Sequence, residues 1–300
     1  MRSALAIEKE IPLYGWRSPE LGRTHMVDLP QGKVTVYDRG QGPTLFFSHG
    51  WLANANLWRH LVPILSRRFR CLVADLPLGA HTQPMNDAFD GSPEGIARLL
   101  NDILDRLGIE SVTLIGNDSG GAYSQITAAA RPERVRALVL NACESPYDSF
   151  PPAAFKGLQE AARSPAGLSA LLAPLRDRSV RGSPAAFGHL IKYPIADEVS
   201  DSYALPVLDL PDVCRDVSKV MSTASQASVA AAGRTLVADF KGLVLFIWPA
   251  EDRFFSLDNI RRYAGELARA KVALVDDSYA FTPEDQPARM AELIAGELGG

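Results

Sequence analysis

An aspartate flanked by small residues stands where an apolar run of the chain gives way to a helical pattern. The apolar run Val112–Ile115 leads into the letters Gly-Asn-Asp-Ser-Gly-Gly at 116–121, in which Asp118 is the acid. Small residues on both sides predict a sharp strand-to-helix turn, a nucleophile elbow, because the backbone of such a corner tolerates almost no side chain. A carboxylate held there attacks carbon directly and forms an ester, whereas a serine would first need a base. The spacing therefore makes Asp118 a candidate nucleophile.

Three other interpretations of the same letters compete with this one. Ser119 could be the nucleophile of a degenerate G-x-S-x-G, but Asn117 then stands where a small residue is wanted. The letters Asp-Ser-Gly-Gly also occur in trypsin-like proteases, which are all-β, whereas this chain alternates strands with helices. Asp118 could also be only the N-cap of the following helix. Caps rarely have glycines on both sides after an apolar strand, so the pattern favours a nucleophile.

The composition is that of a globular protein without a strongly charged surface. The 300 residues are 47% hydrophobic, enough for a sizeable core, and the formal net charge is −4. This charge, and the lack of long Lys and Arg runs, disfavour a nucleic-acid partner. The 3 cysteines are too widely spaced for a disulfide framework or a zinc site. With neither a signal peptide nor a membrane-spanning run, we expect a cytoplasmic protein. We further expect a monomer or homodimer, with no metal and no cofactor.

Short β-branched runs alternate with helical runs over most of the chain. The predicted strands are 33–37, 44–48, 71–74, 112–115, 137–140, 243–248 and 272–275. The predicted helices are 57–67, 93–107, 121–130, 258–269 and 286–297. This alternation predicts an α/β protein with a mainly parallel sheet. Proline-punctuated helical segments replace the strands in between, so we interpret residues 146–239 as a helical cap inserted into a core of residues 1–145 and 240–300.

With these features in place, the chain resembles the capped α/β-hydrolases of the aspartate-nucleophile branch, which includes haloalkane dehalogenases and epoxide hydrolases. The resemblance covers nearly the full length and rests on the elbow and on Phe-Phe-Ser-His-Gly-Trp at 46–51. It implies an α/β-hydrolase fold with a mostly parallel eight-stranded sheet, flanking helices and an inserted cap. It also implies that the backbone N–H groups of Trp51 and Ser119 form an oxyanion hole, and that His49 shapes the loop.

The same resemblance locates the remaining catalytic groups and indicates that the expected histidine is missing. Asp252 stands where the family has its triad acid, Glu251 is interpreted as a solvated neighbour, and Glu144 after the preceding strand is the weaker alternative acid. The histidine of the family belongs in the loop after the last strand. That loop reads Asp-Ser-Tyr-Ala-Phe-Thr-Pro-Glu-Asp-Gln-Pro at 277–287, and Ala280 occupies the histidine's place.

A missing histidine has a defined chemical consequence. Attack by a carboxylate needs no base, but hydrolysis of the resulting ester needs a base to activate water. The second half-reaction should therefore stall unless another group serves. His81, in the loop after the fourth strand at the carboxyl edge of the sheet, is the best substitute by position. His189 is a candidate to face the pocket, whereas His25 and His60 have surface or packing roles by default.

The features that separate the known subclasses are incomplete in this sequence. Dehalogenases resembling this chain hold the halide with a tryptophan directly after the nucleophile, where Ser119 stands here, so only the indole of Trp51 could replace it. Epoxide hydrolases protonate the ring oxygen with cap tyrosines, but their His-Gly-x-Pro turn has Leu52 in place of proline. The Ala- and Leu-rich cap predicts a small hydrophobic substrate. The candidate substrate-binding residues are Trp51, Tyr147, His189, Tyr193, Tyr203, Ala280 and Phe281.

Three functions from different classes follow from these features. The first is a hydrolase that acts on an epoxide, a halide, or a lactone or other ester through Asp118. The second is a lyase, isomerase or cyclase in which Asp118 serves as acid or base and no histidine is needed. The third is a catalytically inactive protein that binds a small apolar ligand. The elbow glycines and the oxyanion loop argue against the third, because a mere binder has no use for so constrained a backbone.

Overall fold

A single sheet of eight strands organises the computed structural model, which describes residues 13–299. The strands are β1 Arg23–Leu29, β2 Gly32–Arg39, β3 Thr44–Ser48, β4 Arg70–Ala74, β5 Val112–Asn117, β6 Val135–Asn141, β7 Leu243–Pro249 and β8 Ala270–Val275. Their order is β1-β2-β4-β3-β5-β6-β7-β8. The pairs β1/β2 and β2/β4 are antiparallel and the other pairs are parallel. The predicted mostly parallel, eight-stranded α/β-hydrolase fold is confirmed.

Each of the seven predicted strands lies within an observed strand, and β1 is the strand that the apolar pattern did not reveal. Only Val27 of β1 is buried, because β1 lies at the edge of the sheet and most of its side chains face solvent. By contrast, every residue of β5 and of β7 is buried, as expected for strands covered on both faces. Burial on both faces therefore made the central strands recognisable in the sequence.

Four predicted helices are observed, and the fifth is wrong. The observed helices are α2 Pro93–Arg106, α3 Ser119–Ala130, α11 Leu257–Glu266 and α13 Pro287–Leu298. In place of a helix over 57–67 there is a 3-10 turn, η3 Ala55–Trp58, followed by the single turn α1 Val62–Leu65. Pro63 explains the break, because it lacks the N–H that a continuous helix would need there.

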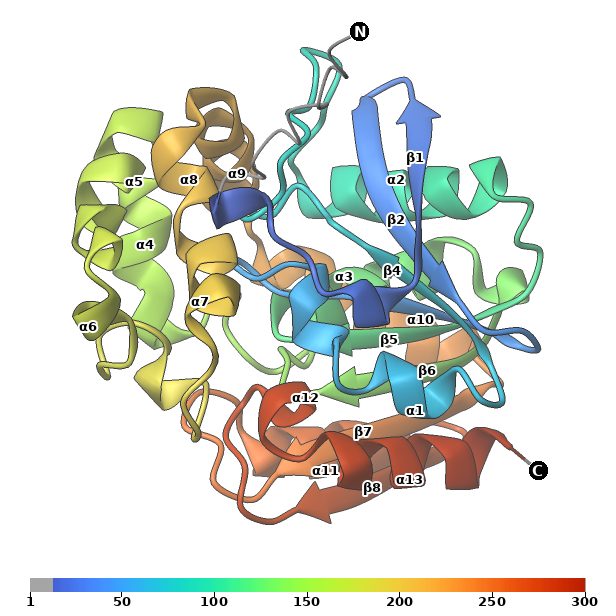
Figure 1. Ribbon diagram of the computed structural model, residues 1–300. Helices are drawn as coiled ribbons and strands as arrows, with labels where there is room; N and C mark the ends of the chain where they lie inside the picture. The colour runs from blue at the N-terminus through green and yellow to red at the C-terminus, as the bar shows by residue number, and fades with distance from the viewer. Residues whose placement is uncertain (1–12, 300) are drawn as a thin grey trace, which may run out of the picture.

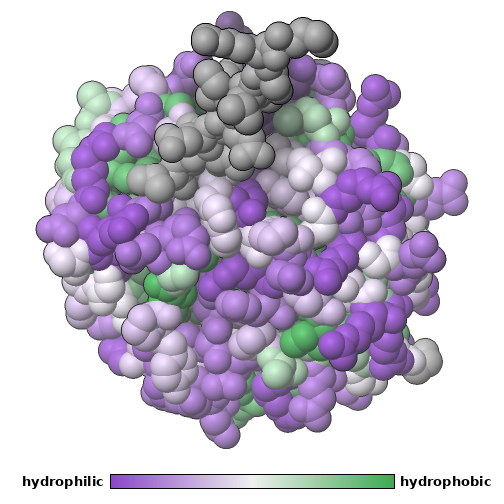
Figure 2. All heavy atoms as spheres, viewed as in Figure 1, coloured by the Kyte–Doolittle hydropathy of each residue, from purple (hydrophilic) through white to green (hydrophobic). Residues whose placement is uncertain are grey.

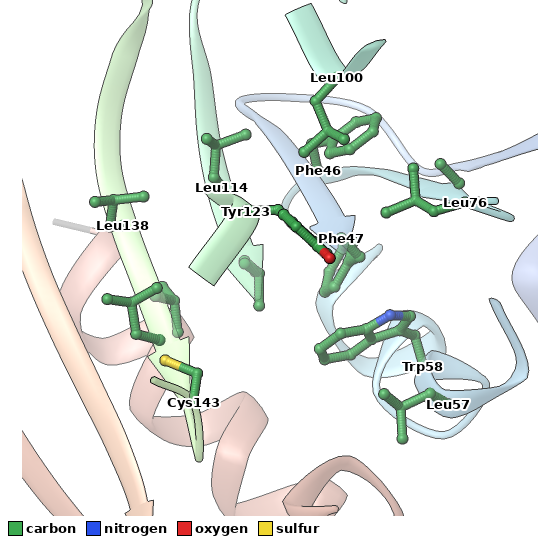
Figure 3. Close-up of a cluster of buried hydrophobic side chains, with 14 of the residues drawn as sticks. Phe46, Phe47, Leu57, Trp58, Leu76, Leu100, Leu114, Tyr123, Leu138 and Cys143 are labelled. Carbon is green, nitrogen blue, oxygen red and sulfur yellow. The ribbon is translucent and has the colours of Figure 1, made fainter. Parts of the chain in front are cut away.

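Helices cover the sheet in two layers. Figure 1 shows α1 and α13 in front of the sheet and α2, α3 and α10 Gln226–Asp239 behind it. The contacts agree, because α3 packs against both α2 and α10, and α1 packs against α13. Figure 3 shows part of the core between these layers, including Phe46 and Phe47 of β3, Leu114 of β5 and Leu138 of β6. All four side chains are fully buried.

The segment between β6 and β7 is helical, as the proline-punctuated pattern predicted. It contains α4 Lys156–Ala161, α5 Pro165–Leu172, α6 Arg178–Arg181, α7 Asp197–Ala204, α8 Pro206–Asp209 and α9 Pro211–Thr223, with short 3-10 turns η5 Ala153–Phe155, η6 Ala173–Arg176 and η7 Phe187–His189. Figure 1 shows α4 to α9 together on one side of the molecule. A second, smaller apolar cluster holds α5 and α9 together. The last helix of the segment, α10, instead packs on α3 beside the sheet.

The outer surface is mainly hydrophilic on the face that Figure 2 draws, where hydrophobic residues form only small separate spots. Between residues 13 and 299, no helix is long and apolar enough to cross a membrane.

Candidate active site

Asp118 occupies a strained corner between β5 and α3. Its backbone angles are φ 55° and ψ −141°, a conformation that costs a non-glycine residue free energy and that clusters at functional sites. The corner needs glycines around it because the neighbouring backbone comes unusually close. A Cβ added to Gly120 would lie 2.5 Å from the backbone oxygen of His49, and one added to Gly50 would lie 2.6 Å from Asp118 Oδ1. This geometry is the sharp strand-to-helix turn that the sequence predicts.

Backbone and hydroxyl donors surround the Asp118 carboxylate. The Ser119 backbone N–H donates to Asp118 Oδ1. The Trp51 backbone N–H lies 3.0 Å from Ser119 Oγ and also contributes a hydrogen bond that stabilises the carboxylate. Burial raises the pKa of Asp118 to about 6, although the hydrogen bonds from Ser119 and Trp51 act in the opposite direction. The two predicted oxyanion-hole residues therefore meet at this carboxylate, which remains partly exposed.

His49 holds the loop that carries Trp51. Its ring is fully buried, and Nε2 accepts a hydrogen bond of 2.9 Å from the Leu76 backbone N–H. Burial lowers the pKa of His49 to about 4, so the ring is neutral at neutral pH. The loop-shaping role expected for His49 matches these contacts.

An aromatic wall stands beside the elbow. The Trp51 indole N–H donates to the Tyr123 hydroxyl at 3.1 Å, and the Trp51 ring stacks on Phe150 with ring centroids 5.6 Å apart. Tyr123 in turn meets Phe150 edge to face. Sequence reasoning missed Tyr123, although its position four residues after Ser119 places it on the same face of α3. Because the Trp51 indole N–H is already bonded, it is not free to hold a halide.

Asp252 turns inward after β7, and Glu251 does not. Asp252 Oδ1 accepts hydrogen bonds of 2.7 Å from the backbone N–H groups of Phe254 and Phe255. Its Oδ2 is buried without a hydrogen-bond partner among the described residues, and burial raises the pKa of Asp252 to about 6. Glu251 is exposed and pairs with Lys192 at 2.6 Å, which fits the solvated neighbour that we expected.

Glu144 is a second carboxyl group close to the elbow. Its side chain is 1% exposed, and Oε2 has no hydrogen-bond partner within the part of the chain that the structure describes. Its backbone oxygen accepts a bond of 2.8 Å from Gln125 of α3. Burial and the charge of Asp118 raise the pKa of Glu144 well above its ordinary range. Both causes favour the protonated form of Glu144.

Ala280 lies in the loop after β8, and this loop is anchored to the strand ends. The Ala280 side chain is fully buried, and its backbone oxygen accepts a hydrogen bond of 2.8 Å from Asn117 Nδ2, next to Asp118. The next residue, Phe281, is also buried and donates its backbone N–H to Leu190 of the cap segment at 2.8 Å. The loop thus comes to the elbow without bringing a titratable side chain at position 280.

The acidic residues of this loop bind the helical segment between β6 and β7. Asp285 accepts backbone hydrogen bonds from Tyr279 at 2.9 Å and from Lys192 at 3.0 Å. Glu284 pairs with Arg59 and accepts a bond of 3.1 Å from the Tyr203 hydroxyl. These contacts join η7 and α7 to the core.

The structure does not bring the three candidate cap tyrosines to Asp118. The hydroxyl of Tyr147 bonds Glu266 of α11, and that of Tyr193 bonds Asp277 at 2.5 Å in a side chain that is 46% exposed. Tyr203 is fully buried but bonds Glu284. Each hydroxyl is occupied by a carboxylate elsewhere, which its place in the sequence could not reveal.

The two candidate histidines lie in different surroundings. His81 is buried, with Nε2 3.4 Å from Asp216 of α9 and Nδ1 accepting from the Gly79 backbone N–H. No described contact joins His81 to Asp118, so its role as substitute base gains no support from the geometry. His189 is partly exposed, and its ring centroid lies 6.4 Å from that of Phe254, two residues after Asp252.

Three cavities of the structure lie away from the elbow. The largest of the three holds about 410 Å³ and lies beside Arg59 and His60, and the second, of about 300 Å³, lies beside Arg178 and Lys192. Asp118 lines none of the three, so an apolar pocket over Asp118 stays a prediction. Within residues 13–299, no three His, Cys, Asp or Glu side chains are grouped to hold a metal ion.

Comparisons with known proteins agree with the fold. The family described as the alpha/beta hydrolase fold matches residues 43–287. Haloalkane dehalogenase 2 of Mycobacterium tuberculosis is 32% identical over 114 residues, which are 38% of this chain and 39% of that protein. The 2-hydroxy-6-oxo-2,4-heptadienoate hydrolase of Pseudomonas putida is 38% identical over 117 residues, 39% of this chain and 40% of that protein. The matches thus span about two fifths of these relatives' length.

Solved structures match nearly the whole chain at low identity. Haloalkane dehalogenase DbeA from Bradyrhizobium elkani has a TM-score of 0.76 at 20% identity and covers 93% of this chain and 98% of its own. The epoxide hydrolase CorEH has a TM-score of 0.75 at 19% identity, with 91% and 97% covered. At such identity the likeness establishes the fold alone.

Proposed function

Because this chain belongs to the alpha/beta hydrolase fold family, we propose that it is a hydrolase in which Asp118 attacks the carbon of a small hydrophobic electrophile. One observation carries this proposal: Asp118 stands in the strained elbow with its carboxylate bonded by backbone N–H groups. Those donors would stabilise the oxyanion that forms when water later adds to the ester. With a pKa near 6, Asp118 is mostly ionised at neutral pH and can act as a nucleophile.

The leaving group that suits this site is an oxygen. Dehalogenases and epoxide hydrolases both share the fold, so the fold does not choose between them. A halide needs free N–H donors, but the Trp51 indole is bonded to Tyr123 and the residue after Asp118 is Ser119. An epoxide or a lactone instead needs a proton donor for the departing oxygen. We therefore propose epoxides or lactones as the substrate class, with α4 to α9 as the lid that encloses them.

The test follows the ester on Asp118. After incubation with styrene oxide, intact-mass spectrometry should detect a transient adduct of one substrate mass, and peptide mapping should place it on Asp118. Asp118→Asn should form no adduct and lose activity by more than about 10³-fold, because the reaction loses its nucleophile. Adduct formation at the normal rate in Asp118→Asn would overturn the proposal.

A second function, a lyase, isomerase or cyclase, is favoured by Ala280, since such a reaction would not need a water-activating base. Reaction in ¹⁸O-labelled water separates the two. A hydrolase incorporates the label into the Asp118 carboxylate during turnover and then into product. A lyase or isomerase would leave both unlabelled.

A further inference from the structure

Three buried or half-buried carboxyl groups surround the elbow without a cation. Among the residues that the structure describes, no Lys, Arg or His forms an ion pair with Asp118, Glu144 or Asp252, and no basic group contributes to their pKa shifts. In the related enzymes a histidine would be the basic partner, and here Ala280 takes its place. The site must therefore hold its protons on carboxyl groups.

Glu144 is placed beside Asp118 by the backbone. The Asp118 N–H donates to the Ala142 backbone oxygen at 2.9 Å, so the end of β6 runs directly along the elbow. Ala142 has φ 38°, a sharp bend at the point where the chain leaves β6 toward Glu144. On the other side, Cys143 packs against Gly121 so closely that a Cβ on this glycine would overlap it. Residues 142–144 therefore form one wall of the elbow.

The state of Glu144 differs from that of Asp118 for a physical reason. Asp118 is partly exposed and receives hydrogen bonds to its charged form, whereas Glu144 is closed off and has an oxygen without a partner. A lone buried carboxylate is costly, so Glu144 keeps its proton. Two neighbouring carboxyl groups, one ionised and one protonated, are the arrangement from which acid and base roles are assigned in carboxylate enzymes.

We propose that Glu144 is the acid–base residue of this site: it protonates the departing oxygen as Asp118 attacks, and then takes a proton from the water that hydrolyses the ester. This inference rests on the proposed function and narrows its substrate class to electrophiles whose leaving atom is oxygen.

Both steps balance with these two residues and water. In the first, the Asp118 carboxylate bonds to the electrophilic carbon, the bond from that carbon to the ring oxygen breaks, and the Glu144 proton passes to that oxygen. In the second, Glu144, now a carboxylate of high pKa, takes a proton from water, and the hydroxide adds to the carboxyl carbon of the Asp118 ester. The tetrahedral intermediate then expels the alkoxide, which receives the proton of the added hydroxyl. Asp118 returns as the carboxylate and Glu144 as the acid.

Two electrophiles separate this role from a structural one. Styrene oxide needs a proton on its leaving oxygen, whereas benzyl bromide releases bromide and needs none. In Glu144→Gln, the rate at which styrene oxide alkylates Asp118 should fall by about 10² to 10⁴. The rate with benzyl bromide should stay within about threefold of wild type, because bromide leaves without taking the Glu144 proton. Intact-mass time courses with peptide mapping measure both rates.

Two further variants complete the test. Asp258→Asn removes an exposed carboxylate of α11, and both rates should remain unchanged. Glu144→Asp keeps an acid and should retain more styrene oxide reactivity than Glu144→Gln. Equal slowing with both electrophiles, or no slowing and normal ester hydrolysis in Glu144→Gln, would overturn the role of Glu144 while leaving Asp118 as nucleophile. Absence of any Asp118 adduct in the wild-type protein would overturn the proposed function and this inference together.

Discussion

The elbow around Asp118 and the loop after β8 both resemble the corresponding parts of related enzymes, but they are held for different reasons. At the elbow, the close contacts of Gly50 and Gly120 serve only to place Asp118 and its donors. In the loop, position 280 holds a buried alanine, while Glu284 and Asp285 bind the helical segment between β6 and β7. Contacts with that segment therefore account for the path of this loop without a titratable side chain at position 280.

The largest effect should come from breaking the elbow. Gly120→Ala places a Cβ 2.5 Å from the His49 backbone oxygen, and neither backbone can move without displacing Asp118. We expect a loss of more than about 4 kcal/mol in the free energy of unfolding, measured by urea denaturation, or failure to fold. The matched control is Gly265→Ala in α11, where an added Cβ meets nothing within 4 Å. It should be neutral or stabilising by up to about 1 kcal/mol.

Ala280→His tests whether a basic side chain at this position of the loop would assist catalysis. The position is fully buried, so an imidazole should overpack it and lower the free energy of unfolding by about 1–3 kcal/mol. If Glu144 supplies the base, turnover of styrene oxide should stay within about threefold of wild type. A gain of about 10² or more would mean that the wild-type chain lacks a base, and would contradict the role of Glu144.

Asp285→Asn tests the structural role of the loop after β8. It weakens the acceptor for the backbone N–H groups of Tyr279 and Lys192, and should reduce stability by about 1–2 kcal/mol in thermal denaturation. Alkylation of Asp118 by benzyl bromide should change little, since Asp285 does not touch the elbow donors. A loss of alkylation as large as that of Asp118→Asn would mean that the loop acts in catalysis after all.

The ionisation of Asp252 gives the stability of the protein a dependence on pH. Its folded pKa, about 6, lies above the ordinary value of 3.8, so the stability that it contributes is present at low pH and is lost as the pH rises through 6. Asp252→Asn removes this loss and should gain about 2 kcal/mol relative to wild type between pH 4 and pH 8. Melting temperatures across this range provide the measurement. Asp258→Asn, whose side chain is 93% exposed, should show no such trend, and a flat difference for Asp252→Asn would refute the assignment.

The parts that the sequence predicts well are contiguous. The elbow occupies residues 112–121, and its small residues, apolar strand and following helix are neighbours in the chain, so local backbone requirements identify Asp118 directly. The central strands were predicted because burial on both faces makes them continuously apolar. The helix predicted over 57–67 was wrong because Pro63 interrupts an otherwise helical apolar pattern.

The sequence by itself determined the α/β fold, the sharp turn that carries Asp118 and the alanine at position 280, because each depends on residue types at fixed local spacing. Only the tertiary structure decided which polar groups are free. It bonds the hydroxyls of Tyr147, Tyr193 and Tyr203 to distant carboxylates and bonds the Trp51 indole N–H to Tyr123. It also leaves Oε2 of Glu144 buried without a hydrogen-bond partner among residues 13–299. Hydrogen bonding and burial depend on segments more than 50 residues apart in the chain, such as Tyr193 and Asp277, so no local pattern records them.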